Sequence, residues 1–291
     1  MMKENIFLTR PLLFDGAMGT ELKRRGLPFG VSPELWNLEN PQVVEEIHRD
    51  YVASGAMVIE TNTFGGNRLR LRRAGLEERI KEINQRAVEI ALKVSQGKIL
   101  VAGSVGPLGE FIEPYGEITK AQVEEFFSEQ IEILKNSGVD FILIETMISL
   151  EEAKIALKSA KKLKCRVGVT MSFEVGEGGV KTILGDDIKE CIKELEKNGA
   201  DFLGSNCGKG FSDMREVAKI IRENTKLPVL IQPNAGIPEV INGKLIYPES
   251  PVSFAQFVEE MLSLGIDFIG GCCGTTPDYI REANKILKRE L

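Results

Sequence analysis

Three of the five cysteines have neighbours and spacing that could support chemistry. Cys207 lies in the segment GSNCG, and Cys272 and Cys273 are adjacent in GGCCGT. The flanking glycines let the backbone approach a ligand closely, which simple core packing does not require. Thiolates are soft ligands that suit Zn²⁺, and a tetrahedral zinc with three protein ligands keeps a fourth position open. The pattern therefore predicts a zinc site made by Cys207, Cys272 and Cys273.

Other interpretations of the cysteines remain. Cysteine often behaves as a small buried hydrophobic residue, and we expect this of Cys165 and Cys191. The vicinal Cys272–Cys273 pair could serve a redox role, although neighbouring cysteines form only a strained bridge and the sequence has no CxxC. Three thiolates make zinc a poor Lewis acid toward water. The cluster therefore favours activation of a substrate thiol, and alkyl transfer to that thiol, over hydrolysis.

An internal repeat indicates the elements that must position these cysteines. A glycine that ends a helix and is followed by a buried strand recurs in SGAMVIETN, SGVDFILIE, NGADFLGSN and LGIDFIGGC. Further apolar segments lie between these strands, at 12–16, 99–103, 167–173 and 229–232. Amphipathic helix patterns alternate with the strands, at 42–53, 121–135, 150–163, 188–197, 254–264 and 278–288. Eight strand–helix units predict an α/β fold, one (β/α)8 TIM barrel over residues 1–291, in preference to a doubly wound open sheet.

The carboxyl ends of barrel strands should carry the functional side chains. Asp15 follows the first strand and Glu145 ends the fourth, so the two carboxylates could pair with an ammonium group. Glu60 on the second strand has a similar claim, although strand alternation could turn it outward. Asn234 follows the seventh strand, and we expect its side-chain oxygen to be a labile fourth ligand of the substrate-free metal. A helix cap for Asp15 and a turn residue for Asn234 are the alternatives.

The loop after the first strand offers an anion site. Its sequence DGAMGT holds two glycines, which let successive backbone N–H groups point into the barrel opening and hold a carboxylate. The residues concerned are Gly16, Ala17, Met18 and Gly19. Anion, cation and sulfur sites at one opening together predict a thiol-bearing amino acid as substrate.

Charge and composition narrow the partners and the compartment. The net charge is −6, so we expect neither nucleic acid nor a membrane as a partner. Five cysteines are few and odd in number, and the first residues hold no apolar signal segment, which favours the cytoplasm. The only histidine, His48, excludes sites that need two histidines and is expected on the surface of a helix. The segments 176–179 (GEGG) and 234–251 are expected to be a flexible loop and a long loop.

Four motifs together resemble the homocysteine S-methyltransferase family, namely DGAMGT, ETNTFGGN, GSNCG and GGCCGT. The resemblance spans nearly the whole chain. It implies a TIM barrel in which Cys207, Cys272 and Cys273 bind Zn²⁺ and L-homocysteine supplies the fourth sulfur. It also implies that Asp15 and Glu145 contact the amino group of homocysteine, while the backbone amides of residues 16–19 hold its carboxylate.

Members of this family differ in their methyl donor. The segments RPLLFDGAMGTELKRRG and GGCCGTTP are most similar to the N-terminal homocysteine-binding module of cobalamin-dependent methionine synthases, in which folate- and cobalamin-binding modules follow. The resemblance implies methylcobalamin supplied by another module or partner, and we expect the chain to be a fragment or to work with such partners. The alternative is a stand-alone enzyme that uses S-methylmethionine or betaine.

Overall fold

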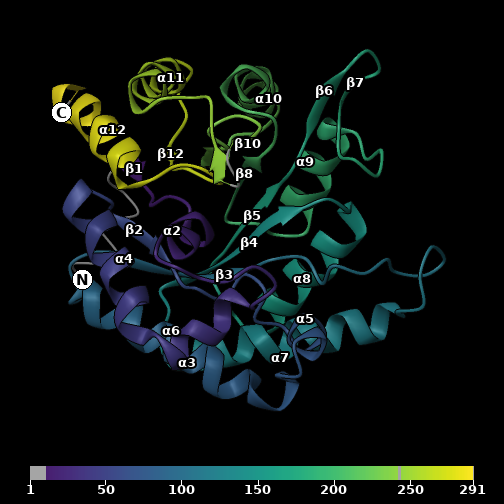
Figure 1. Cartoon of the computed structure of the whole chain (residues 1–291). Helices are drawn as coiled ribbons and strands as arrows, with labels where there is room; N and C mark the ends of the chain where they lie inside the picture. The colour runs from purple at the N-terminus through teal and green to yellow at the C-terminus, as the bar shows by residue number, and fades with distance from the viewer. Residues whose placement is uncertain (1–10, 242–243, 291) are drawn as a thin grey trace.

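Eight parallel strands form a closed inner ring in the computed structural model, which describes residues 11–241 and 244–290 (Figure 1). The strands are β1 (Leu12–Leu13), β2 (Val58–Glu60), β3 (Leu100–Val105), β4 (Phe141–Met147), β5 (Val167–Met171), β8 (Phe202–Cys207), β9 (Val229–Pro233) and β12 (Phe268–Ile269). They pair in the order β1-β12-β9-β8-β5-β4-β3-β2, and a parallel bridge between Phe14 and Val58 joins the two ends. The predicted TIM barrel is confirmed.

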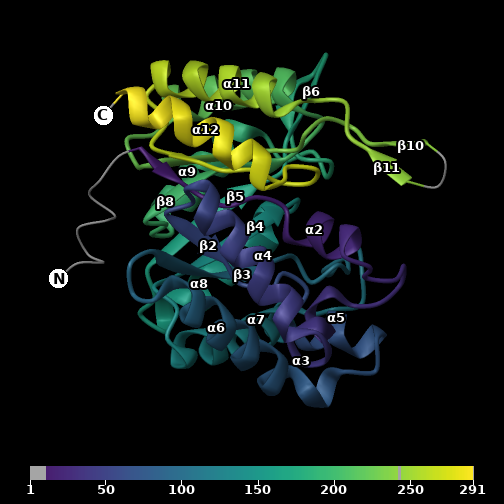
Figure 2. The same ribbon diagram turned by 60° about the vertical axis from the view of Figure 1, so that its left-hand side comes forward.

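Helices surround the ring on its outside, as the two views in Figures 1 and 2 show. The longer ones are α4 (Pro41–Ser54), α6 (Ile80–Ser95), α7 (Lys120–Ser137), α8 (Leu150–Lys162), α9 (Ile188–Lys197), α10 (Phe211–Asn224), α11 (Pro251–Ser263) and α12 (Pro277–Glu290). Shorter segments are α2 (Met18–Arg24), α3 (Trp36–Glu39), α5 (Arg68–Arg73), and the 3₁₀ turns η1 (Pro33–Leu35) and η2 (Glu77–Arg79). Within the described residues, no helix combines the length and apolar character that crossing a membrane needs.

The repeated glycines end helices as expected. Gly55 and Gly138 cap α4 and α7 with φ of 109° and 101°, in the left-handed region that favours glycine. Gly199 and Gly265 also have positive φ, of 90° and 75°. Each glycine turns the chain into a buried strand.

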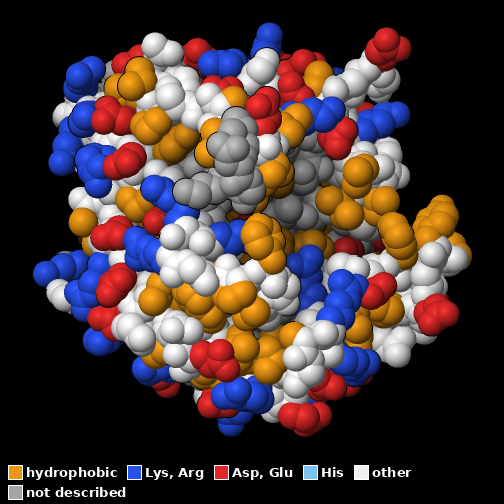
Figure 3. Space-filling view, in the orientation of Figure 1, with side chains coloured by type: hydrophobic (Ala, Val, Ile, Leu, Met, Phe, Trp, Pro, Cys, Tyr) orange, Lys and Arg blue, Asp and Glu red, His pale blue; other side chains and the backbone are white. Residues whose placement is uncertain are grey.

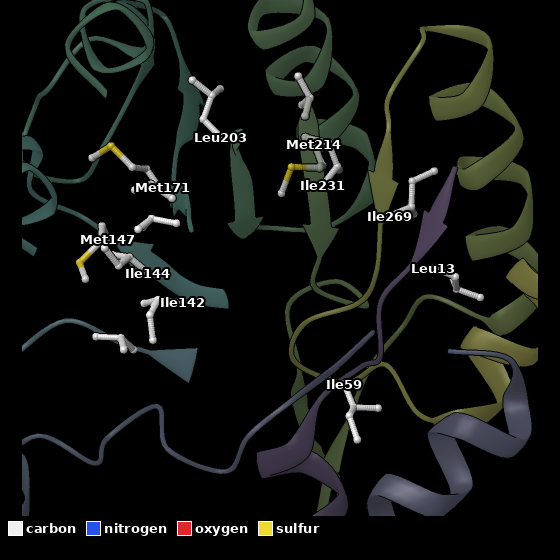
Figure 4. Close-up of a cluster of buried hydrophobic side chains, with 14 of the residues drawn as sticks. Leu13, Ile59, Ile142, Ile144, Met147, Met171, Leu203, Met214, Ile231 and Ile269 are labelled. Atoms are coloured by element: carbon white, nitrogen blue, oxygen red, sulfur yellow. The ribbon is translucent and has the colours of Figure 1, made fainter. Parts of the chain in front are cut away.

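Strand alternation separates two apolar clusters. Side chains on the helix side of the strands, such as Leu13, Ile59 and Ile142, join the larger cluster, part of which is drawn in Figure 4. Their neighbours along each strand fill the inside of the ring. There the rings of Phe14, Phe141, Phe202 and Phe268 contact one another, with centroids 5.3 to 6.2 Å apart. The end of the barrel nearest the strand starts is therefore a packed aromatic layer.

Two segments expected to be loops are antiparallel hairpins. The segment around GEGG forms β6 (Glu174–Gly176) paired with β7 (Gly179–Lys181). The segment 234–251 contains β10 (Glu239–Ile241) paired with β11 (Lys244–Ile246). The segment 234–251 is the long connection from β9 to α11 (Pro251–Ser263), as expected. Neither hairpin was predicted, because short strands that pair only with each other leave little hydrophobic pattern to detect.

His48 is fully buried rather than exposed, so its predicted surface position was wrong. The helix that carries it, α4, packs against α2, α3, α6 and α12 as well as β2, so more than one of its faces is covered. Neither ring nitrogen of His48 has a hydrogen-bond partner in the described chain. Burial lowers the pKa of the imidazole to about 4, which keeps the ring neutral near pH 7.

Candidate metal centre and substrate pocket

The three predicted cysteines meet at the carboxyl ends of neighbouring strands. Cys207 ends β8, and Cys272 and Cys273 follow β12, with β9 between them. Their three sulfur atoms lie within 4.8 Å of one another. The loop that carries Cys272 and Cys273, the cysteine loop, is fixed to β9 by two backbone hydrogen bonds of 2.9 Å. The Cys272 amide donates to the Pro233 carbonyl, and the Ala235 amide donates to the Cys273 carbonyl. The predicted convergence of the thiols is confirmed.

Cys207 adopts an unusual backbone conformation. Its φ is 71°, in the left-handed region that residues with a side chain rarely enter. Gly208 follows with φ of 75°. Two such residues in a row turn the chain sharply at the end of β8. Strain of this kind is held at functional sites because the surrounding structure fixes it.

The thiols also interact through their protons. Hydrogen bonds from Cys272 and Cys273 lower the pKa of Cys207, so this sulfur is the preferred thiolate. The same contacts raise the pKa of Cys272, and the contact with Cys207 helps raise the pKa of Cys273 to about 11.

The cluster fits zinc in number, type and spacing of donors. Sulfurs around a tetrahedral zinc, with bonds of about 2.3 Å, lie about 3.8 Å apart. A separation of up to 4.8 Å among the three sulfurs is close to that value. Cys272 is half-buried and Cys273 is exposed, so one side of the cluster is open to the pocket. Three soft donors with one open side match a metal that keeps a position for a ligand.

Asn234 lies beside the cluster, but with its amide nitrogen toward it. Nδ2 donates to the Cys207 sulfur at 3.3 Å and to the Gly208 carbonyl at 2.7 Å. Its Oδ1 is buried and has no hydrogen-bond partner in the described chain. The side chain is therefore next to the predicted metal, while ligation through Oδ1 needs the amide to turn and stays a prediction.

Two predicted carboxyl groups, Asp15 and Glu145, lie on the pocket wall near the thiols. Asp15 is 2% exposed and accepts from the Glu60 amide at 3.0 Å through Oδ2, while its Oδ1 is buried without a partner. Glu145 is 8% exposed and accepts from the Ser104 hydroxyl. Burial raises the pKa of both groups, that of Glu145 to about 7. Neither carboxyl pairs with a basic side chain in the described chain, so both can take a cationic group from a ligand.

Glu60 points into the pocket and not outward. Val58, two residues earlier on β2, belongs to the cluster inside the ring, and the period of two places Glu60 on the same side. The Gln232 amide donates to Glu60 Oε1 at 2.7 Å. Burial raises the pKa of Glu60 well above its usual range. From the sequence, alternation along the strand left the direction of the Glu60 side chain open. The register of β2, with Val58 inside the ring, fixes that direction.

The predicted anion loop lines the same pocket. Gly16, Ala17, Met18 and Gly19 all face the cavity. The Ala17 amide donates to the Thr275 carbonyl at 3.1 Å, so the prediction that this amide serves a ligand needs correction. Met18 and Gly19 begin α2, where the first backbone amides have no carbonyl one turn earlier. The other amides of the loop remain the predicted carboxylate site.

Asn206 connects the carboxyl and sulfur sides of the pocket and was not singled out from the sequence. Its Nδ2 lies 3.4 Å from Glu145 Oε2 and 3.8 Å from the Cys272 sulfur, and its Oδ1 accepts from the Thr170 hydroxyl at 2.7 Å. Its position two residues after Gly204 on β8, on the inner face, was the available signal.

Tyr247 was also missed. It follows β11 and lines the same cavity as Thr20. Its ring lies against Gly274, where an added Cβ would stand 2.3 Å from Tyr247 Cδ1. Because Tyr247 reaches the cysteine loop from a hairpin, no local pattern links the two.

The pocket itself has a volume of about 870 Å³. Acidic, amide and thiol groups line it, together with Lys23, Phe29 and Tyr247. Figure 3 views this side of the barrel and shows hydrophobic side chains gathered in several patches on it. The volume is in the range of small-molecule sites and leaves room for more than a single small amino acid.

Comparison with known proteins gives a consistent result. The family model of homocysteine S-methyltransferase matches residues 12–287. The chain is 32% identical over 299 residues to methionine synthase of Mycobacterium leprae (strain TN), and 32% identical over 295 residues to methionine synthase of Mycobacterium tuberculosis. These matches cover 96% of this chain but 24% and 25% of the two relatives, so the chain spans about a quarter of their length.

Among solved structures, the metallated form of the homocysteine methyltransferase MmuM from Escherichia coli is similar to this fold. The TM-score is 0.82 at 25% sequence identity, with 99% of each chain covered. The similarity therefore extends over the full barrel and is not limited to the site.

Proposed function

Because this chain belongs to the homocysteine S-methyltransferase family, we propose that it transfers a methyl group to the thiol of L-homocysteine and so forms methionine. The observation that carries the proposal is the cluster of three cysteine sulfurs within 4.8 Å of one another at the mouth of the barrel. A redox or packing role would not require three thiols from two separate strands to face one open pocket.

Cys207, Cys272 and Cys273 would hold Zn²⁺, with Asn234 beside them as the candidate fourth ligand in the absence of substrate. When bound, zinc supplies acidity to the substrate thiol by lowering its pKa, while the three thiolates keep the site electron-rich. The left-handed backbone at Cys207 and the bonds from the cysteine loop to β9 would hold the three donors together without a metal. Such preorganisation favours one geometry of the bound sulfur.

The amino-acid part of homocysteine would bind along the inner wall. Asp15 and Glu145 would accept from the ammonium group, and the buried, unpartnered Oδ1 of Asp15 supports this assignment. Backbone amides of the loop 16–19 would donate to the carboxylate. Anchoring both groups directs the thiol toward the cysteines.

Transfer would then be an in-line displacement. The sulfur forms a bond to the methyl carbon while the bond from that carbon to the donor breaks, and the thiol proton passes to solvent. The residues of the chain contribute by binding and orienting the acceptor, and by limiting water at the reacting sulfur. Because bound zinc would already lower the pKa of the substrate thiol, no separate general base is needed to remove its proton.

For the donor, we propose delivery by a separate cobalamin-binding module, with a folate-binding module supplying the methyl group in turn. Residues 1–291 would form one domain, the homocysteine-activating module, working in the reducing cytoplasm where the thiols stay free. Large hydrophobic side chains more than one-third exposed lie on the loops and hairpins that follow barrel strands, and Phe29, Leu245 and Ile246 among them line the pocket. The others are Phe111, Tyr115, Ile183, Leu184, Ile237 and Val240. An apolar rim of this kind supports docking of a protein-sized donor.

A stand-alone enzyme that takes S-methylmethionine or betaine is the second candidate. The observation in its favour is that MmuM matches the chain along 99% of both lengths. Assays of this chain alone with S-methylmethionine, betaine or free methylcobalamin separate the two. Turnover with either of the first two donors at rates above those with methylcobalamin would replace the module proposal.

Zinc K-edge X-ray absorption with and without L-homocysteine tests the core of the proposal. We expect three sulfur ligands at about 2.3 Å without substrate and four with it. Four sulfurs in both states would indicate a closed structural site. A protein that binds no zinc after loading would return the cysteines to redox or packing roles.

A further inference from the structure

A third carboxyl group lies in the proposed ammonium site. Glu60 faces the same pocket as Asp15 and Glu145, and its backbone amide donates to Asp15 Oδ2 at 3.0 Å. The carboxyl groups of Glu60 and Glu145 also lie close enough for each to influence the pKa of the other. Three ionised carboxyls around one ammonium group would be two more than its single positive charge balances.

Charge alone argues against three carboxylates here. In the described chain, none of the three groups forms an ion pair with a basic side chain. One ammonium group beside three carboxylates would leave a net charge of −2 in a buried site, which is costly at low dielectric. Two carboxylates that contact each other also need a proton between them.

The partners of Glu60 identify where that proton belongs. Glu60 Oε1 accepts from the Gln232 amide at 2.7 Å, as the carbonyl oxygen of a neutral acid does. Its other oxygen is then free to donate to Glu145. Glu145 already accepts from the Ser104 hydroxyl and from Asn206, which are contacts that suit a carboxylate. Burial and the neighbouring carboxylates raise the pKa of Glu60, in agreement with this assignment.

We propose that Glu60 is a positioning residue that stays protonated, donates to Glu145, and thereby aims the Glu145 carboxylate at the α-ammonium group of the substrate. The inference rests on the proposed function and adds the protonation pattern and amine selectivity of its acceptor site. Gln232 holds Glu60 in place through Oε1. The site then presents the two negative charges of Asp15 and Glu145 to the amino group, and Glu60 adds no charge.

The test compares Glu60→Met with Glu60→Gln in the zinc-loaded protein. Methionine keeps the length of the side chain and removes its hydrogen bonds, whereas glutamine mimics the neutral acid, with an oxygen for Gln232 and an N–H for Glu145. We measure the Kd of L-homocysteine by titration calorimetry, together with bound zinc and the melting temperature. We expect Glu60→Met to weaken homocysteine binding at least tenfold and Glu60→Gln to recover most of that loss.

A second ligand separates positioning from a structural effect. 4-Mercaptobutyrate has the thiol and carboxylate of homocysteine but no amino group, so its Kd should differ by less than threefold among the parent and both variants. Glu145→Gln is the matched control, and we expect it to weaken homocysteine and spare 4-mercaptobutyrate.

Three results would overturn the proposal. Equal losses in Glu60→Gln and Glu145→Gln would make Glu60 a third carboxylate. Unchanged binding in Glu60→Met would remove it from the site, and parallel losses for both ligands would make its role structural. If the zinc-loaded parent itself fails to bind homocysteine, the proposed function fails, and that result is distinct from these three.

Discussion

The two ends of the barrel interior are built from the same strands but have opposite character. Along the inner face of β4, Phe141 and Leu143 are followed by Glu145, and along β8, Phe202 and Gly204 are followed by Asn206. The lower layer is a set of phenylalanine rings in mutual contact. The upper layer holds carboxyl, amide and thiol groups. Along β4 and β8, the aromatic side chain that packs the core and the polar side chain of the candidate site are thus only four residues apart.

The upper layer also contains buried polar atoms that have no hydrogen-bond partner among the described residues. Asp15 Oδ1, Gln232 Oε1 and Asn234 Oδ1 are buried without hydrogen-bond partners in the described chain. Each such atom costs about 1–3 kcal/mol when it is left unsatisfied. The apolar lower layer offsets this cost, and a bound ligand or metal would reduce it. The difference between the layers can be tested by changing one residue in each.

Cys272→Ala should have the largest effect, and it should fall on chemistry. Losing one of three sulfurs removes the metal, so we expect bound zinc to disappear and methyl transfer to fall by about a thousandfold or more. With chelator present, the free energy of unfolding should stay within about 1 kcal/mol of the parent. Metal analysis, activity and urea denaturation measure the three quantities. Full activity of this variant without metal would contradict the proposed mechanism.

Phe202→Ala should do the reverse. The substitution opens a cavity in the ring of phenylalanines, and we expect the free energy of unfolding to drop by about 3–5 kcal/mol. The fraction that stays folded should still bind one zinc, because Cys207 and the cysteine loop keep their own contacts. Denaturant unfolding and zinc analysis on the same sample decide it. A loss of zinc at unchanged stability would mean that the two layers are not separable.

His48 is a buried polar side chain outside the upper layer and sharpens the comparison. Its pKa is about 4 in the fold, below the usual value of 6.5, so the unfolded chain binds the proton more readily. Above pH 6.5 the imidazole is neutral in both states and costs the fold no stability. As the pH falls toward 4, protonation of the unfolded chain lowers the free energy of unfolding by up to about 3 kcal/mol. We expect His48→Leu to unfold less steeply with acid than the parent over that range. Parallel stability curves from pH 7 to 4 would show that His48 is accessible to protons in the fold.

Gly168→Ala should give the smallest effect of the four. A Cβ at Gly168 would lie 2.0 Å from the Phe202 ring, so the aromatic layer must shift, at a cost of about 1–3 kcal/mol. Gly178→Ala in the β6–β7 hairpin is the matched control, because its Cβ would meet nothing within 4 Å. In the Phe202→Leu background the cost at Gly168 should shrink. A double-mutant cycle on the free energy of unfolding measures that coupling.

Much of this arrangement could be predicted from the sequence. The repeat of glycine-capped helix and buried strand predicted four of the eight strands, and the apolar segments between them predicted the other four. The rule that strand ends carry function gathered Cys207, Cys272 and Cys273. These signals are local or periodic, so they survive without coordinates. The thiols needed one further step, the closure of the ring, which places β8 and β12 two strands apart.

The rest depended on contacts between distant segments. Glu60 could face either side until the register of Val58 was known, and the burial of His48 depends on several helices packing around α4. Asn206 meets the site through partners 60 residues or more away in the sequence, such as Thr146. Tyr247 reaches the site from a hairpin. The sequence could place the Asn234 amide near the predicted metal. Which of its atoms faces the Cys207 sulfur is decided by the Gly208 carbonyl, which accepts a hydrogen bond from Nδ2.

The position of the cysteines along the chain also sets an order of events during synthesis. Cys207 precedes Cys272 by 65 residues, and β9, which holds the cysteine loop in place, lies between them. A chain still emerging from the ribosome therefore exposes Cys207 long before its partners exist. If the three cysteines hold a metal, all three can bind it together only after the last barrel strand, β12, has been made. A metal held by all three sulfurs would therefore join the chain late in its synthesis.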